Sequence, residues 1–155
     1  MAGIPPISLT GLLMIYKIYV TVNGFDYTLG SHKYYPVERV FAEMTPAMLH
    51  RSEDKEGLTI QLLEVGPNLY QIVGYDNIYK MGGWKLYVDY DQSENAHNVI
   101  FHSKLATIFN IIQMPDDTYL FKVDGKDLYL FMNQNCPRDS ASYFLFAKPL
   151  KDLSE

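Results

Sequence analysis

The feature that most constrains this chain is a self-similar pattern that recurs about every fifty residues. Each copy has two short apolar runs on either side of a turn, then a polar loop and a closing hydrophobic segment. The turns are Gly66-Pro67 in the second copy and Pro115-Asp116-Asp117 in the third. A fixed period of this length is typical of repeat architectures. The predicted repeats cover about residues 8–54, 55–105 and 106–151 of a single domain spanning 1–155.

Composition narrows the class of protein. The chain has 155 residues, of which 48% are hydrophobic, so it is long enough to bury a core without disulfides or metals. The formal net charge is −5, and lysine and arginine form no cluster. Nucleic acids and anionic membranes both require clustered positive charge. We therefore expect neither nucleic-acid nor membrane partners.

The single cysteine, Cys136, excludes an internal disulfide and suggests a reducing compartment or export without a signal peptide. The apolar run at 12–16 lacks a preceding basic segment, is interrupted by Lys17 and is too short to span a bilayer. We expect this run to form the first strand, after an extended lead-in at 4–6. The prediction is a cytoplasmic protein that is a monomer or weak dimer.

Secondary structure is predicted to be almost entirely β. Tyrosine and phenylalanine are abundant, and the apolar runs are short and bounded by turn residues. Asn23-Gly24 and Asp124-Gly125 supply the positive φ angles that tight hairpins require. The best helical candidate is 46–51, with one or two turns in a connecting loop. Counting the runs gives about four strands in each repeat, or about twelve in all.

A dozen short strands in three similar units resembles the β-trefoil superfamily, over about residues 12–150. The resemblance implies a six-stranded barrel capped by three hairpins, which would remove exposed sheet edges. It also implies that the aromatic residues near the ends of the repeats, Phe41, Phe101 and Phe146, lie in the core. The alternative fold is a lipocalin-like calycin barrel. That family opens with a Gly-x-Trp motif, whereas the only tryptophan here, Trp84, lies in the middle of the chain.

Sequence motifs for catalysis are absent. The four histidines are scattered without the spacing of metal ligands, and there is no nucleophile elbow, phosphate loop or dinucleotide fingerprint. Acidic pairs such as Asp116-Asp117 are interpreted as turn residues. We therefore predict a non-catalytic binding protein without a cofactor or a metal, whose partner is a protein, namely a protease, or a glycan.

The leading hypothesis is a protease inhibitor, on a fold-level resemblance to the Kunitz and mycocypin inhibitors. Such inhibitors present a loop held in an extended conformation, which reduces the entropy lost on docking. The matching connection here is 45–57, and its centre is His50-Arg51-Ser52. Trypsin-like proteases have an acidic pocket that selects arginine or lysine. Arg138, in Cys136-Pro137-Arg138-Asp139, is a second candidate.

The alternative hypothesis is a carbohydrate-binding lectin. Ricin-type lectins usually end their repeats with Gln-x-Trp, which all three repeats lack, but other trefoil lectins use different pockets. Aromatic rings that stack on sugars are then the candidate binding residues, namely Tyr34, Tyr35 and Trp84. A further alternative is a cytokine-like receptor ligand, which the lack of a signal peptide and the single cysteine would suit.

Overall fold

The structure, a computed structural model, describes residues 7–12, 14–31, 43–75, 81–90, 96–132 and 142–150. All twelve elements in these ranges are strands, which confirms the predicted all-β class and the number of strands. The strands are β1 (Ile7–Leu12), β2 (Ile15–Val22), β3 (Phe25–Ser31), β4 (Met44–Arg51), β5 (Ile60–Gly66), β6 (Leu69–Gly74), β7 (Lys85–Asp89), β8 (His97–His102), β9 (Phe109–Gln113), β10 (Tyr119–Val123), β11 (Tyr129–Met132) and β12 (Ser142–Lys148).

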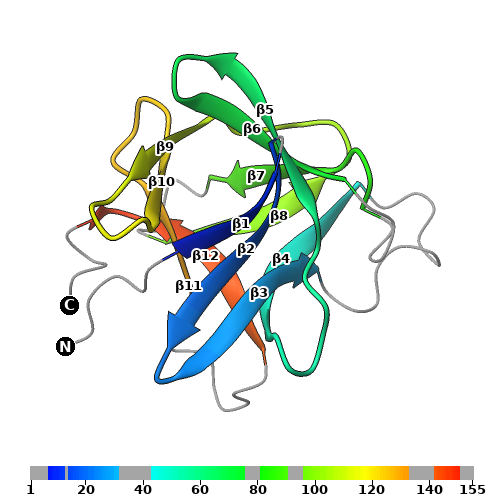
Figure 1. Ribbon diagram of the computed structural model, residues 1–155. Coiled ribbons are helices and arrows are strands. Elements are labelled where there is room, and N and C mark those ends of the chain that lie inside the picture. Colours follow the sequence, from blue (N-terminus) through cyan, green and yellow to red (C-terminus); the bar gives the residue numbers. More distant parts are fainter. Residues whose placement is uncertain are drawn as a thin grey trace.

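Several predicted turns connect these strands as expected. Asn23 and Gly24 have φ angles of 52° and 82° and close the β2–β3 hairpin. Asn68 (φ 58°) lies between β5 and β6, and Gly125 (φ 76°) lies between β10 and β11. Positive φ angles match the twist of the flanking strands in tight hairpins. Figure 1 shows the β2–β3 and β5–β6 hairpins extending from opposite ends of the molecule.

Two local predictions are wrong. The run at 12–16, expected to be the first strand, instead contains the turn between β1 and β2, where Met14 has a φ angle of 66°. The helical candidate at 46–51 belongs to strand β4. This segment pairs with β3, β8 and β12, so three ladders of hydrogen bonds override its helical propensity. The proposed lead-in at 4–6 lies outside the described residues.

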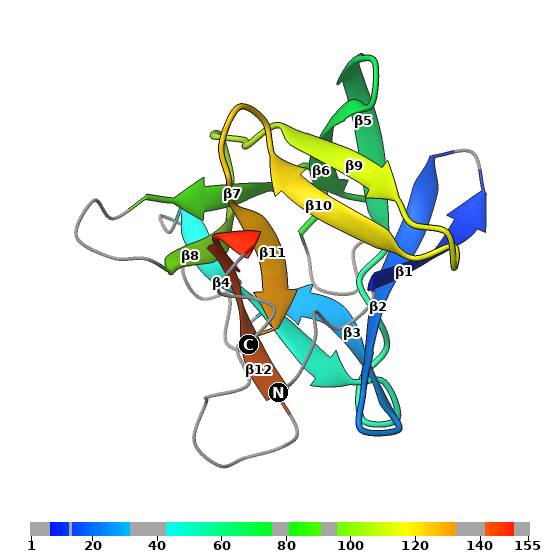
Figure 2. The same ribbon diagram turned by 90° about the vertical axis from the view of Figure 1, so that its left-hand side faces the viewer.

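The strands close into a barrel. Antiparallel pairings form a continuous ten-stranded path in the order β1-β10-β11-β12-β4-β8-β7-β6-β5-β2, and β2 pairs with β1 to complete it. Two strands lie off this path, because β3 pairs with β2 and β4 whereas β9 pairs with β10 and β6. Figures 1 and 2 show the strands surrounding a common centre.

The predicted β-trefoil, a six-stranded barrel capped by three hairpins, is therefore wrong. Hydrogen bonds close around ten strands rather than six. The calycin-like barrel named as the alternative agrees better with this closure. Pairings between strands do recur every four strands: β1–β2, β5–β6 and β9–β10 are paired, and β4, β8 and β12 pair with one another.

Side chains fill the centre of the barrel. Phe101, Phe109 and Phe121 are fully buried among the aliphatic core residues. A central void lined by core side chains measures only about 10 Å³, which is too small for a ligand. Phe101 thus confirms its predicted core position, whereas Phe146 does not, because Leu145 and Ala147 are the buried residues of β12. Phe41 lies outside the described residues. A ligand site of the described residues must therefore lie away from the centre of the barrel.

Candidate functional site

Three strands meet at one place on the barrel and exchange partners there. Strand β4 pairs with β8 through Met44–Pro46 and with β12 through Met48–His50. Strand β12 in turn pairs with β8 at Phe146 and Ala147. Each strand thus leaves one neighbour and joins the next within a few residues. We call this place the β4–β8–β12 junction.

The hydrogen-bond ladders open at the centre of the junction. Ala47, Val99 and Leu145 are the residues at which β4, β8 and β12 change partners. Among the described residues, each has a register partner only in the strand on its other side: β3 for Ala47, β7 for Val99 and β11 for Leu145. The small side chain of Ala47 is fully buried at this point. Strand exchange therefore leaves a hollow in the outer surface of the sheet.

This hollow is a pocket of about 390 Å³. Its volume is in the range of about 300–1,000 Å³ that is usual for sites of small ligands. Because side chains alternate along a strand, Phe144 and Phe146 lie on the outer face of β12 while Leu145 lies inside. The residues that line the junction pocket are Met44, Thr45, Pro46, Asp89, Asn98, Val99, Ile100, Phe144, Leu145 and Phe146.

Aromatic rings form one wall of the junction pocket. Phe144 is 40% exposed, and its ring centroid lies 6.4 Å from that of Phe146. The ring of Phe131 packs edge-on against Phe146 at 6.1 Å, and Lys148 Nζ lies 4.5 Å above the ring of Phe131. These contacts support Phe146 from behind and leave Phe144 available to a ligand.

Two exposed polar residues line the same pocket, and one of them, Asn98, is the register partner of Phe146. Asp89 and Asn98 face each other across the β7–β8 ladder, and both are exposed. An ionised carboxylate accepts hydrogen bonds, whereas an amide side chain both donates and accepts them. The junction pocket therefore combines a broad apolar surface with a few polar groups, which is the usual composition of a ligand site.

His50, a predicted binding residue, is buried in the sheet. Its Nε2 lies 2.9 Å from the carbonyl oxygen of Ser31, and its Nδ1 lies 2.8 Å from Ser142 Oγ. Because a carbonyl oxygen only accepts hydrogen bonds, Nε2 carries the proton in that contact. The imidazole ring thus connects β4 to both β3 and β12. We interpret His50 as a structural residue that holds β3, β4 and β12 together.

Arg51 and Ser52 lie at the end of β4, where the chain turns back on itself. The guanidinium carbon of Arg51 is 3.9 Å from the centre of the Phe25 ring, and Nη2 donates to Glu53 Oε2 at 2.8 Å. The side chain is only 20% exposed. Ser52 donates from its backbone nitrogen and its hydroxyl group to the carbonyl oxygen of Asp26. Arg51 is therefore held against the protein.

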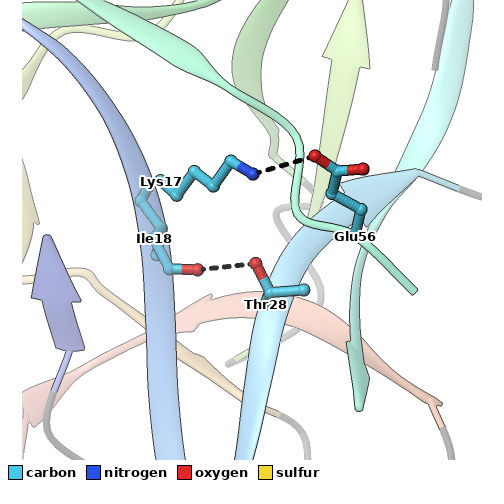
Figure 3. A network of polar contacts seen from close by, with 4 residues as sticks. All are labelled: Lys17, Ile18, Thr28 and Glu56. Carbon is cyan, nitrogen blue, oxygen red and sulfur yellow. Dashed lines mark hydrogen bonds and ion pairs between the residues drawn. The ribbon is translucent and has the colours of Figure 1, made fainter. Parts of the chain in front are cut away.

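The predicted inhibitory connection at 45–57 is not an extended loop. Its first seven residues belong to β4, and the remainder folds back against β2 and β3. Lys17 Nζ lies 3.3 Å from Glu56 Oε2, and Thr28 Oγ1 donates to the carbonyl oxygen of Ile18 at 3.3 Å. Figure 3 shows both contacts. The exposed ion pair stabilises this arrangement only slightly.

Trp84, another predicted binding residue, is half-buried and packs against the core. Its carbonyl oxygen accepts a hydrogen bond from the backbone nitrogen of Gly74 at 2.7 Å. Trp84 does not line the junction pocket. Tyr34, Tyr35 and Arg138 lie outside the described residues.

Sequence reasoning missed the junction residues Phe144, Asp89 and Asn98. The signal that pointed to Phe144 was alternation, because Phe144-Leu145-Phe146 places two aromatic rings on the same face of a strand. Because Phe146 was predicted to lie in the core, the face of the strand that carries both rings was taken to point inwards. Asp89 and Asn98 carried no comparable signal, since they are nine residues apart and meet only through the pairing of β7 with β8.

Tyr27 on β3 packs beside Tyr143 on β12, with the two ring centroids 5.4 Å apart. Burial raises the pKa of the Tyr27 phenol above its ordinary value. The neighbouring phenol of Tyr143 raises this pKa further through charge repulsion and a hydrogen bond, whereas the charge of Arg51 lowers it. The fold therefore favours the neutral form of Tyr27.

This raised pKa predicts a loss of stability in alkali. Below the pKa of about 10 for tyrosine in the unfolded chain, the contribution of neutral Tyr27 is complete. As the pH rises above 10, the unfolded chain loses its proton first, so the free energy of unfolding falls. Tyr27→Phe should cost about 1 kcal/mol at pH 7 and make this alkaline decline less steep. Urea titrations from pH 8 to 11 measure both effects, and parallel declines would contradict the prediction.

The described residues contain no group of three or more His, Cys, Asp or Glu arranged to hold a metal ion. No helix in the described ranges is long and apolar enough to cross a membrane. No protein-family model, curated protein or solved structure matches this chain.

Proposed function

We propose that this protein binds carbohydrate, without catalysis, in the junction pocket. The observation that carries the proposal is the meeting of exposed Phe144 with Asp89 and Asn98 in one pocket of about 390 Å³. A sugar ring has apolar C–H faces and a polar rim of hydroxyl groups. The Phe144 and Phe146 rings can stack against the C–H faces of the sugar. The Asp89 carboxylate and the Asn98 amide can form hydrogen bonds with its hydroxyl groups.

The inhibitor hypothesis has less support from the same geometry. Insertion into a trypsin-like pocket requires an arginine that protrudes from an extended loop. Arg51 instead ends a strand, stacks on Phe25 and pairs with Glu53. Releasing it would break these contacts before any contact with a protease forms. No feature of the described residues favours the cytokine-like alternative.

The test of the proposal is a glycan array, followed by calorimetric titration of the sugar that binds best. Phe144→Ala should weaken binding about tenfold, because it removes the stacking surface and its buried apolar area. Asn98→Ala should weaken binding several-fold by removing a hydrogen-bonding group. The fold should survive both changes, since both side chains are exposed.

Tyr75→Ala is a matched control, because Tyr75 is 53% exposed and does not line the junction pocket. This variant should bind the sugar as the native protein does. If the native protein binds no glycan on the array, the proposal is refuted. Equal loss of binding in Phe144→Ala and Tyr75→Ala would place the sugar elsewhere.

A further inference from the structure

A second pocket lies beside Arg51, on the other face of β12 from Phe144. It measures about 250 Å³ and shares no lining residue with the junction pocket. Because consecutive residues of a strand point to opposite faces, Tyr143 lines this second pocket while Phe144 lines the first. The residues that line the second pocket, which we call the Arg51 pocket, are Val22, Asn23, Phe25, Tyr27, Arg51, Met132 and Tyr143.

Arg51 carries the only formal positive charge among the residues that line this pocket. Its guanidinium carbon lies over the Phe25 ring, 3.9 Å from the ring centroid, and this cation–π contact restrains the guanidinium group. One nitrogen, Nη2, donates to Glu53. The Nε atom is buried, and no described residue accepts a hydrogen bond from it. A buried donor of this kind is left with an uncompensated loss of hydration.

Other polar groups line the same pocket. Tyr27 and Tyr143 bring phenol groups into the pocket, and Asn23 brings an amide from the β2–β3 turn. Val22 and Met132 add apolar surface. At about 30 Å³ for each water molecule, the volume holds roughly eight waters, or a small organic anion.

We infer that the Arg51 pocket binds a small organic carboxylate. A guanidinium group presents parallel N–H donors that match the two oxygens of a carboxylate, and Nε–H is the unused member of this set. The Asn23 amide and the Tyr143 phenol supply additional donors, since the Tyr27 phenol donates to Tyr143, and the apolar residues contact the organic part of the anion. One arginine with Glu53 beside it suits a monoanion better than a doubly charged phosphate.

The test uses benzoate as the probe and follows the Nε–H resonance of Arg51 by NMR. Arg51→Lys assigns this resonance, because lysine has no such group. In the native protein we expect the resonance to shift saturably, with a Kd of about 1 mM. Sodium chloride at equal ionic strength should not reproduce the shift, and inorganic phosphate should not displace benzoate.

In the two Arg51 variants, which lack this Nε–H group, the Kd is measured from the backbone amide resonances of residues that line the pocket, such as Asn23 and Tyr143. Arg51→Gln should raise the Kd for benzoate at least about tenfold, since it removes a charged hydrogen-bonding partner. Arg51→Lys should raise it several-fold, because the charge remains but the paired donors are lost. Tyr143→Phe should raise it about threefold. Lys104→Gln is the matched control for charge: Lys104 is 77% exposed, lies outside the pocket and should leave the Kd unchanged.

Unfolding curves for each variant establish that the fold is retained, and Arg51→Lys and Tyr143→Phe keep the test open if Arg51→Gln is unstable. Absence of a saturable shift in the native protein would overturn the inference. So would equal affinity of the native protein and Arg51→Lys for benzoate, or displacement of benzoate by phosphate. Because the two pockets share no residue, Phe144→Ala should leave benzoate binding intact, so the two proposals fail or succeed independently.

Discussion

Phe101→Ala is expected to destabilise the protein by about 3–5 kcal/mol, the usual cost of truncating a fully buried phenylalanine. Phe101 has no exposed surface and stands in register with Leu86 on β7 and Thr45 on β4. Because the barrel centre is already filled, the lost ring leaves a cavity that its neighbours cannot readily occupy. This loss is a large share of the free energy of unfolding, which is roughly 5–15 kcal/mol for folded domains.

Urea denaturation of the native protein and the variant measures this loss. Phe101→Leu is the graded control, and it should cost about 1–1.5 kcal/mol because it keeps most of the apolar volume. Tyr75→Ala, at an exposed site, should cost less than about 0.5 kcal/mol. A cost below about 1 kcal/mol for Phe101→Ala would contradict a packed interior. Phe101→Ala should also weaken sugar binding indirectly, because Phe101 helps to fix the β4–β8 pairing beside the junction pocket.

Gly74→Ala is expected to have the second largest effect, about 3 kcal/mol. Gly74 ends β6, and a Cβ atom there would overlap the backbone carbonyl group of Met81. That carbonyl oxygen already accepts a hydrogen bond from the nitrogen of Trp84, and Met81 is fully buried. Gly74 itself donates to the carbonyl oxygen of Trp84. Relief of the overlap therefore requires a backbone shift that breaks hydrogen bonds.

Thermal unfolding provides the measurement for Gly74→Ala, with Tm expected to fall by roughly 6–12 °C in a chain of this size. Gly24→Ala is the matched control. Gly24 has a φ angle of 82°, but a Cβ atom there meets nothing within 4 Å. Its substitution should cost only about 1 kcal/mol of backbone strain. A Tm for Gly74→Ala equal to that of Gly24→Ala would show that close packing is not the reason for glycine at this position.

Much of the local structure could be predicted from the sequence. The Asn23-Gly24 and Asp124-Gly125 turns lie between strands as expected, because φ preferences act within a few residues. The errors at 12–16 and 46–51 have a different origin. Met14 has a positive φ angle, which few non-glycine residues adopt, so its residue type did not predict a turn. Residues 46–51 are held as a strand by partners far away in the sequence.

The candidate site could be predicted from the sequence to a much smaller extent. Arg51 was singled out for a protruding loop, yet the structure places it in a pocket against Phe25 and near Tyr143, which comes about ninety residues later. Phe146 was assigned to the core because the resemblance to the β-trefoil implies a core aromatic near the end of each repeat, but alternation placed Leu145 inside instead. Which face of a strand is buried depends on its register with its partners, and a shift of one residue reverses it.

The sequence by itself determined the all-β class, the approximate number of strands and several of their turns. Its apolar alternation and turn residues act over short distances, which is why they can be recognised along a single chain. Only the tertiary structure decided that ten strands close into the barrel and that β4, β8 and β12 exchange partners. Both pockets depend on pairings between segments far apart in the chain. Such pairings are selected by the packing of the whole molecule, because many registers satisfy the same local pattern.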